Sequence, residues 1–242
     1  MHRLTAAGVF RSLFRVVKTN HSHSFCRMKV TTSAEWVKRQ LRDPYVQMRR
    51  AAQYRARSAY KLIEIDDKYK LFKKGQCVVD CGAAPGAWTQ VAVQRTQVDT
   101  SQGEGEVCVV AVDLLPIQPV KGAITIAPAD FTHPSTITRI QDALSNRAVS
   151  VVLSDMSPTL SGIKELDHEN GMMLAIAARD FALTHSALGA HFLCKIFQGG
   201  TENKFLESLK EFYEHVRYVK PNSSRSESRE IYVLARRMKK RI

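Results

Sequence analysis

A lysine inside an apolar segment is the residue whose position most directly suggests chemistry. Lys195 lies in residues 192–197 (FLCKIF), where all its neighbours are apolar. Burying an ammonium group is costly unless the group is paired or deprotonated. A carboxylate follows another apolar run at Asp155, within residues 154–158 (SDMSP). The alternative for Lys195 is a place at the end of a strand, from which its ammonium reaches water.

Two further charged residues are candidates for the same site. Glu230 follows residues 220–229 (KPNSSRSESR), a polar loop whose hydroxyls and arginines suit phosphate groups, and it begins an apolar run. Lys61 lies in a segment with helical spacing. Taken alone, Glu230 is typical of a surface acid and Lys61 of a solvated helix residue, so neither indicates a site by itself.

A glycine-containing turn at residues 80–88 (DCGAAPGAW) joins an apolar run to a helical segment. Gly82 and Gly86 allow a tight turn and a close approach to a ligand, and Pro85 stiffens the turn. Ligands of open α/β sheets bind at this place, where the following helix presents free N–H groups. The residues predicted to contact a nucleotide here are Asp80, Gly82, Ala83, Ala84, Pro85, Gly86, Ala87 and Trp88.

Two common nucleotide-binding turns fit this segment badly. The dinucleotide fingerprint G-x-G-x-x-G needs a glycine at position 84, which is alanine. A phosphate-binding P-loop needs Gly-Lys-Ser/Thr, but Trp88 and Thr89 follow Ala87. A dehydrogenase is therefore a poor hypothesis.

Carboxylates mark the ends of four successive apolar runs, at Asp80, Asp113, Asp130 and Asp155. Parallel strands would bring all four to one edge of a sheet. Asp113, followed by Leu114, is well placed to accept hydrogen bonds from both ribose hydroxyls of an adenosyl ligand. Asp130 is predicted to accept from an adenine amine, with Phe131 packed on the ring. Any one loop aspartate is commonplace, but the set of four favours a nucleotide site.

The order of the elements predicts how these residues are positioned. Strand-like apolar runs alternate with helix-length segments, which implies a parallel sheet with helices on both faces. The last two runs are separated by only eleven residues (220–230), too few for a helical crossover, so they should pair antiparallel as a hairpin. This mostly parallel, seven-stranded layout is similar to that of the Rossmann-like methyltransferases. The predicted strands are 77–79, 107–112, 123–127, 150–153, 190–197, 215–219 and 231–235, and the helices are 87–97, 134–145, 168–188 and 202–213.

A helical extension, residues 33–70, precedes the first strand within a single domain, residues 33–242. Asp43-Pro44 is a cap followed by proline at the first helical position. Ser58 is a candidate cap for the helix that contains Lys61. Arg49, Arg50, Arg55 and Arg57 cluster around Tyr54 and are predicted to contact RNA, as are residues 220–229 and 236–241.

The first 32 residues have the composition of a mitochondrial transit peptide or a disordered segment. Residues 1–34 contain no Asp or Glu and alternate basic with apolar and hydroxyl side chains. The alternative is a basic RNA-binding arm. Losing the six basic residues up to position 30 lowers the net charge from +13 to +7. The remainder is still basic, which favours a polyanionic partner: nucleic acid or an anionic membrane surface.

Several classes of protein are disfavoured by composition. No window approaches the roughly 18 apolar residues of a membrane span. The five cysteines are odd in number and lack close pairs, which argues against a disulfide framework. Cys77 and Cys81 have no partners at zinc spacing, so no metal site is predicted.

In combination, the motifs resemble the FtsJ/RrmJ family of ribosomal RNA 2′-O-ribose methyltransferases, from about residue 33 to 236. The family's Lys–Asp–Lys–Glu tetrad falls by motif match on Lys61, Asp155, Lys195 and Glu230, and the family often has Gly-Gly where this chain has Gly86-Ala87. The matching words are DPYVQ (43–47), RSAYKL (57–62), LFKKGQCVVDCGAAPGAW (71–88), DLLP (113–116), SDMSP (154–158), KIFQG (195–199) and KPNSSRSESREIYV (220–233).

The resemblance implies methyl transfer from S-adenosyl-L-methionine to a ribose hydroxyl. Lys195 would assist loss of the hydroxyl proton or stabilise the developing oxyanion, and Lys61 would favour a deprotonated Lys195 as a neighbouring cation. Asp155 would hold Lys195, and Glu230 would orient Lys61 or the ribose. The implied substrate is a uridine of mitochondrial large-subunit ribosomal RNA in the matrix, free or in a pre-ribosomal particle. Transfer RNA, mRNA caps and a non-catalytic role in ribosome assembly remain alternatives.

Overall fold

A computed structural model describes residues 43–51, 53–97, 108–159, 161–225 and 227–241, in two compact units, 1–53 and 54–242. In the first unit, helix α3 (Pro44–Ala51) begins directly after Asp43, whose Oδ1 accepts a hydrogen bond from the Tyr45 amide at 3.0 Å. This confirms the predicted helix start. The predicted transit segment, residues 33–42 of the predicted helical extension, and residues 98–107 lie outside the described residues.

The second unit contains one seven-stranded sheet with the order β3-β2-β1-β4-β5-β7-β6. Strands β1 to β5 are parallel, and β7 is antiparallel to both of its neighbours. The order reverses direction between β1 and β4, the position where open α/β sheets bind ligands. The bounds are β1 (Val78–Cys81), β2 (Val109–Val112), β3 (Ile124–Ile126), β4 (Val149–Ser154), β5 (Ser186–Phe197), β6 (Tyr213–Val219) and β7 (Glu230–Met238).

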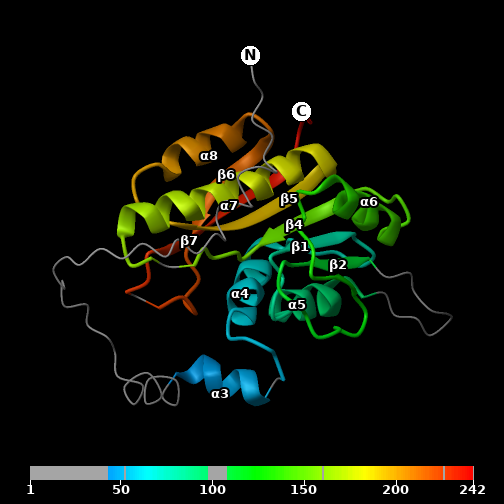
Figure 1. The fold of residues 1–242 in the computed structure, drawn as a ribbon, viewed down its shortest axis with the longest axis horizontal. Coiled ribbons are helices and arrows are strands. Elements are labelled where there is room, and N and C mark those ends of the chain that lie inside the picture. Colours follow the sequence, from blue (N-terminus) through cyan, green and yellow to red (C-terminus); the bar gives the residue numbers. More distant parts are fainter. Residues whose placement is uncertain (1–42, 52, 98–107, 160, 226, 242) are drawn as a thin grey trace, which may run out of the picture. The chain divides into compact units, whose positions relative to one another are not determined.

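Helices cover both faces of this sheet (Figure 1). On one face lie α4 (Ala59–Tyr69) and α5 (Ala87–Thr96); on the other lie α6 (Pro134–Ala143), α7 (Lys164–His185) and α8 (Glu202–Lys210). Because both faces are covered, the central strands are buried throughout, as their apolar runs predict. Among the described residues, no helix is long and apolar enough to cross a membrane.

The boundary between α7 and β5 differs from its predicted position. The spacing predicts a helix to residue 188 and a strand from 190, but the strand already begins at Ser186. A register irregularity lies between Val149 and Val151 of β4, where Ser186 and His191 are the successive partners on β5. Pairing across the sheet thus extends the strand beyond its apolar run, which local spacing cannot indicate.

A buried apolar cluster joins α4 and α5 to the centre of the sheet. It includes Leu62 and Ile65 of α4 and Trp88 of α5, packed with Leu193 and Tyr232 from the strands. The rings of Trp88 and Tyr232 are 5.7 Å apart between centroids. The described cysteines, Cys77, Cys81, Cys108 and Cys194, have buried thiols, and none of these four is in a disulfide.

Candidate active site

The glycine turn closes tightly between β1 and α5. Gly82 and Gly86 adopt φ values of +73° and +102°, in the left-handed region that favours glycine. The amides of Gly82 and Ala83 donate to the Val112 carbonyl at 2.9 and 3.1 Å, which ties the turn to the end of β2. A Cβ atom on Gly82 would lie 2.0 Å from Cγ of Met156, so the loop after β4 packs directly on the turn.

Replacing Gly82 with alanine is expected to weaken cofactor binding at least about tenfold. The left-handed backbone costs an alanine about 1–2 kcal/mol, and Met156 must move besides. Gly189→Ala is a matched control, because Gly189 also has a positive φ (+82°) but no atom within 4 Å of the added Cβ. Both variants should lower the unfolding free energy. Calorimetric titration with S-adenosylmethionine should separate them, and equal affinity in the two variants would contradict a role for the turn.

Asp113 holds the turn from the end of β2. Its Oδ2 accepts from the Ala84 amide at 2.8 Å and its Oδ1 from the Leu115 amide at 2.7 Å. Each carboxylate oxygen has two lone pairs, so acceptor capacity remains for the predicted ribose hydroxyls. Leu114 is exposed beside it, whereas Ala87 and Trp88 have buried side chains at the start of α5.

The residues after β3 make contacts within the protein. Oδ1 of Asp130 accepts from the amide and the hydroxyl of Thr132, at 2.9 and 2.7 Å. Phe131 is buried, with its ring edge-on to Phe181 of α7 at 6.0 Å between centroids. Phe131 therefore packs against the helix layer, and its predicted contact with adenine stays a prediction.

Asp80 is a fully buried carboxyl among other carboxylates. Burial, together with the nearby charges of Asp155 and Asp113, raises its pKa to about 7, and the Thr89 hydroxyl bonded to its Oδ2 at 2.7 Å opposes this shift in part. Three of the four aspartates that were predicted to share an edge, at the ends of β1, β2 and β4, thus lie close enough for their charges to interact. The negative charge gathered there suits a cationic ligand.

The raised pKa of Asp80 makes stability depend on pH. The folded protein keeps a proton on Asp80 up to about pH 7, whereas the unfolded chain loses it near pH 4. This contribution is fully present below about pH 4 and is lost as the pH rises to about 7. Asp80→Asn should therefore flatten the fall in unfolding free energy across this window, measured by urea denaturation. Asp142→Asn, an exposed substitution on α6, is the control, and identical slopes in both variants would contradict the assignment.

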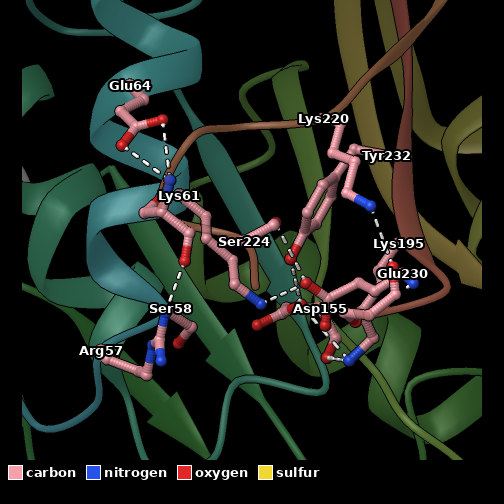
Figure 2. A network of polar contacts seen from close by, with 12 residues as sticks. Arg57, Ser58, Lys61, Glu64, Asp155, Lys195, Lys220, Ser224, Glu230 and Tyr232 are labelled. Atoms are coloured by element: carbon pink, nitrogen blue, oxygen red, sulfur yellow. Dashed lines mark hydrogen bonds and ion pairs between the residues drawn. The ribbon is translucent and has the colours of Figure 1, made fainter. Parts of the chain in front are cut away.

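The lysine of the apolar strand is buried and paired (Figure 2). The Lys195 side chain is only 8% exposed, and its Nζ donates to the Asp155 carbonyl at 2.7 Å and lies 3.4 Å from Asp155 Oδ1. The Tyr232 hydroxyl donates to the same Oδ1 at 2.9 Å. The alternative of a lysine that extends into water is therefore wrong.

Lys61 and Glu230 form a second, partly buried pair in the same network. Nζ of Lys61 donates to Glu230 Oε1, with both side chains about one-seventh exposed (13% and 14%). The Ser224 hydroxyl donates to the same oxygen at 3.4 Å. Burial alone would raise the pKa of Glu230, but the charges of Lys61 and Lys195 and these hydrogen bonds hold it below its ordinary value. Glu230 is therefore ionised at neutral pH.

Tyr232 connects the two pairs and was not singled out from the sequence. Its ring centroid is 5.8 Å from Lys61 Nζ, and its hydroxyl bonds Asp155. Burial and the charges of Asp155 and Glu230 raise the pKa of Tyr232 well above its usual value, so the hydroxyl stays protonated as a donor. The sequence feature that could have indicated Tyr232 is its position two residues after Glu230. Alternate residues of a strand share a face, so Tyr232 is expected on the same face as Glu230.

Two arginines predicted to bind RNA are engaged within the protein. Arg57 Nη2 donates to the Ser223 carbonyl at 2.6 Å, and Arg55 donates to the carbonyls of Pro85, Gln118 and Pro119. Arg49 and Arg50 lie in α3, in the other unit. Among the described residues, no group of three or more His, Cys, Asp or Glu side chains could hold a metal ion.

Comparisons with known proteins return methyltransferases. The family model of the FtsJ-like methyltransferases matches residues 54–238. The chain is 44% identical over 209 residues to "rRNA methyltransferase 2, mitochondrial" of Drosophila melanogaster, covering 86% of this chain and 84% of that protein. It is 46% identical over 209 residues to "Ribosomal RNA large subunit methyltransferase E" of Gluconobacter oxydans, covering 86% and 74%. A crystal structure described as a ribosomal RNA methyltransferase of Plasmodium falciparum superposes with a TM-score of 0.65 at 27% identity, covering 78% of this chain and all of that one.

Proposed function

The chain belongs to the FtsJ-like methyltransferase family, and from this premise we propose that it methylates the ribose 2′-hydroxyl of a uridine in large-subunit ribosomal RNA. The names of the relatives from Drosophila melanogaster and Gluconobacter oxydans support ribosomal RNA as the substrate class. The observation that carries the proposal is the joining of Lys61, Asp155, Lys195 and Glu230 into one largely buried network beside the glycine turn.

The residues of the turn fit S-adenosylmethionine as the donor. Gly82 leaves a surface on which any side chain would collide with Met156, and Asp113 has lone pairs left for ribose hydroxyls. The cluster of Asp80, Asp113 and Asp155 favours a positive charge at the strand ends. When bound, S-adenosylmethionine supplies a methyl group on a cationic sulfonium.

The buried lysines suit the loss of a proton from a poor nucleophile. In methyl transfer, the bond between the ribose oxygen and the methyl carbon forms as the carbon–sulfur bond breaks, and the hydroxyl proton must leave. Lys195, held by Asp155, either takes up this proton as a neutral amine or, as an ammonium, stabilises the oxygen as negative charge develops on it. Lys61 adds a second positive charge, and Glu230 fixes its direction. Holding the hydroxyl in line supplies a large part of the rate.

The reaction is tested by transfer of a labelled methyl group from S-adenosylmethionine to mitochondrial large-subunit RNA, naked and in assembling particles. A methyl group on the 2′-oxygen blocks alkaline cleavage of the next phosphodiester, so digestion in alkali should leave the label in uridine-containing dinucleotides. Transfer RNA and capped mRNA are the competing substrates. Label on a base would refute 2′-O-methylation. Cofactor binding without transfer to any of these RNAs would favour an assembly factor that retains the fold.

We place this activity in the mitochondrial matrix. The acid-free, basic segment of residues 1–34 supports this location, as does the similarity to a mitochondrial protein of Drosophila melanogaster. The experiment is import into isolated mitochondria, with processing to a shorter chain as the expected result. A chain without residues 1–32 should not be imported.

A further inference from the structure

A short segment before α4, residues 54–58, lies along α5 and contacts both halves of the site. The Tyr54 hydroxyl donates to Gln94 Oε1 at 2.6 Å, and the Arg55 amide donates to Gln90 Oε1 at 2.9 Å. The Trp88 indole donates to the Ser58 carbonyl at 2.9 Å. Three hydrogen bonds to α5 therefore hold the segment from which Arg55 and Arg57 extend.

Arg55 links the glycine turn, residues 80–88, to the segment that follows β2. Its Nη1 donates to the Pro85 carbonyl at 3.0 Å and to the Gln118 carbonyl, and its Nη2 donates to the Pro119 carbonyl at 2.6 Å. A rigid, planar guanidinium can hold several acceptors in one geometry, which a lysine cannot. A Cβ atom on Gly86 would lie only 2.7 Å from Arg55 Nη1, so the guanidinium packs on the turn itself.

Arg57 binds the backbone of the loop that precedes Glu230. Its Nη2 donates to the Ser223 carbonyl, and the Ser223 amide donates to the Glu64 carboxylate at 3.0 Å, so α4 and its N-terminal segment hold both backbone groups of this residue. The next residue, Ser224, is buried and directs its hydroxyl to Glu230. Figure 2 shows Arg57, Glu64 and Ser224 around the Lys61–Glu230 pair.

We propose that Arg55 and Arg57 are positioning residues that serve different halves of the site, Arg55 the glycine turn and Arg57 the loop that places Ser224 against Glu230. This division rests on the proposed function. It differs from the interpretation of both arginines as phosphate ligands, because a guanidinium that holds backbone carbonyls in place acts on affinity for the cofactor or on turnover. A phosphate ligand would act on RNA affinity and its salt dependence.

The test compares Arg55→Gln with Arg57→Gln in the full chain. Arg55→Gln should raise the Kd and KM for S-adenosylmethionine about tenfold, while kcat at saturating cofactor changes less than about twofold. Arg57→Gln should lower kcat about tenfold and leave the cofactor Kd unchanged. In both variants the affinity for ribosomal RNA and its salt slope should match the wild type. Weaker RNA binding with a smaller salt slope and an unchanged cofactor Kd would overturn the proposal for that arginine.

Three controls make the outcome decisive. Thermal unfolding identifies a variant that has lost its fold. Arg55→Lys should restore only part of the cofactor affinity, because a compact ammonium does not match the arrangement of carbonyls that the planar guanidinium holds. Arg217→Gln, an exposed arginine on β6, should behave as wild type. Cofactor binding is measured without RNA, so Arg55 is tested whichever RNA is the substrate. A wild-type protein that binds no S-adenosylmethionine would refute the proposed function, whereas equal binding by wild type and Arg55→Gln would refute the role of Arg55.

Discussion

Lys195→Met should lower the rate of methyl transfer about a thousandfold while leaving S-adenosylmethionine bound with near wild-type affinity. A positioned acid–base group contributes roughly 10²–10⁴-fold to the rate, and Lys195 Nζ lies buried against Asp155. Methionine keeps the length and apolar volume of the side chain and removes the ammonium. The measurement is single-turnover methyl transfer at saturating cofactor and RNA, which excludes product release from the rate.

Lys195→Arg distinguishes the two roles open to this residue. Arginine keeps the positive charge but cannot be deprotonated in a protein. Loss of activity as complete as in Lys195→Met would assign Lys195 to proton removal, whereas substantial activity would assign it to charge stabilisation. The control is Lys204→Met, an exposed lysine on α8. Because removal of the ammonium leaves Asp155 without its ion-pair partner, thermal unfolding must accompany each assay. A folded Lys195→Met protein with the wild-type rate of methyl transfer would refute the proposed active site.

Lys61→Met and Glu230→Gln should each lower the rate about a hundredfold, and the double variant should be hardly worse than either. Residues that act as a unit lose their function together, so their effects do not multiply. The two groups are joined by a hydrogen bond and share a buried environment. Single-turnover rates of the four proteins give the coupling directly.

A lysine in an exposed ion pair is the matched control for Lys61. Lys210→Met removes an exposed lysine that pairs with Glu207 on α8, and this surface pair should contribute nothing measurable to the rate. A double variant of Lys61 and Glu230 that falls by the product of the two single effects would mean that they act independently. Glu230 would then contact the ribose directly instead of orienting Lys61.

The family and the fold class predicted from the sequence are confirmed, and both depended on local patterns. Apolar runs predict strands covered on both faces, and parallel strands end at a common edge, which brings Asp80, Asp113 and Asp155 together. The turn at residues 80–88 was recognisable because its glycines serve a local backbone conformation. The antiparallel end of the sheet followed from a connection too short for a crossover.

The four residues of the tetrad were not equally visible in the sequence. Lys195 stood out because an ammonium in an apolar strand requires an explanation. Lys61 and Glu230 had no such local signal, and only the resemblance to a known family selected them. Their pairing requires α4 to lie against β7, a contact between residues separated by 169 positions in the chain.

The amino-acid sequence by itself determined which segments become strands, helices and turns, apart from the boundary between α7 and β5, and therefore which residues reach the binding edge. The tertiary structure alone decided the insertion of β7 between β5 and β6, the use of the Tyr232 hydroxyl on Asp155, and the binding of Arg55 and Arg57 to carbonyls. The physical reason is the separation along the chain of the residues that interact. Backbone periodicity depends on residues that are neighbours in the sequence. Burial of a charge, the pKa of Asp80 and the partner of a guanidinium depend on groups that only long-range packing brings together.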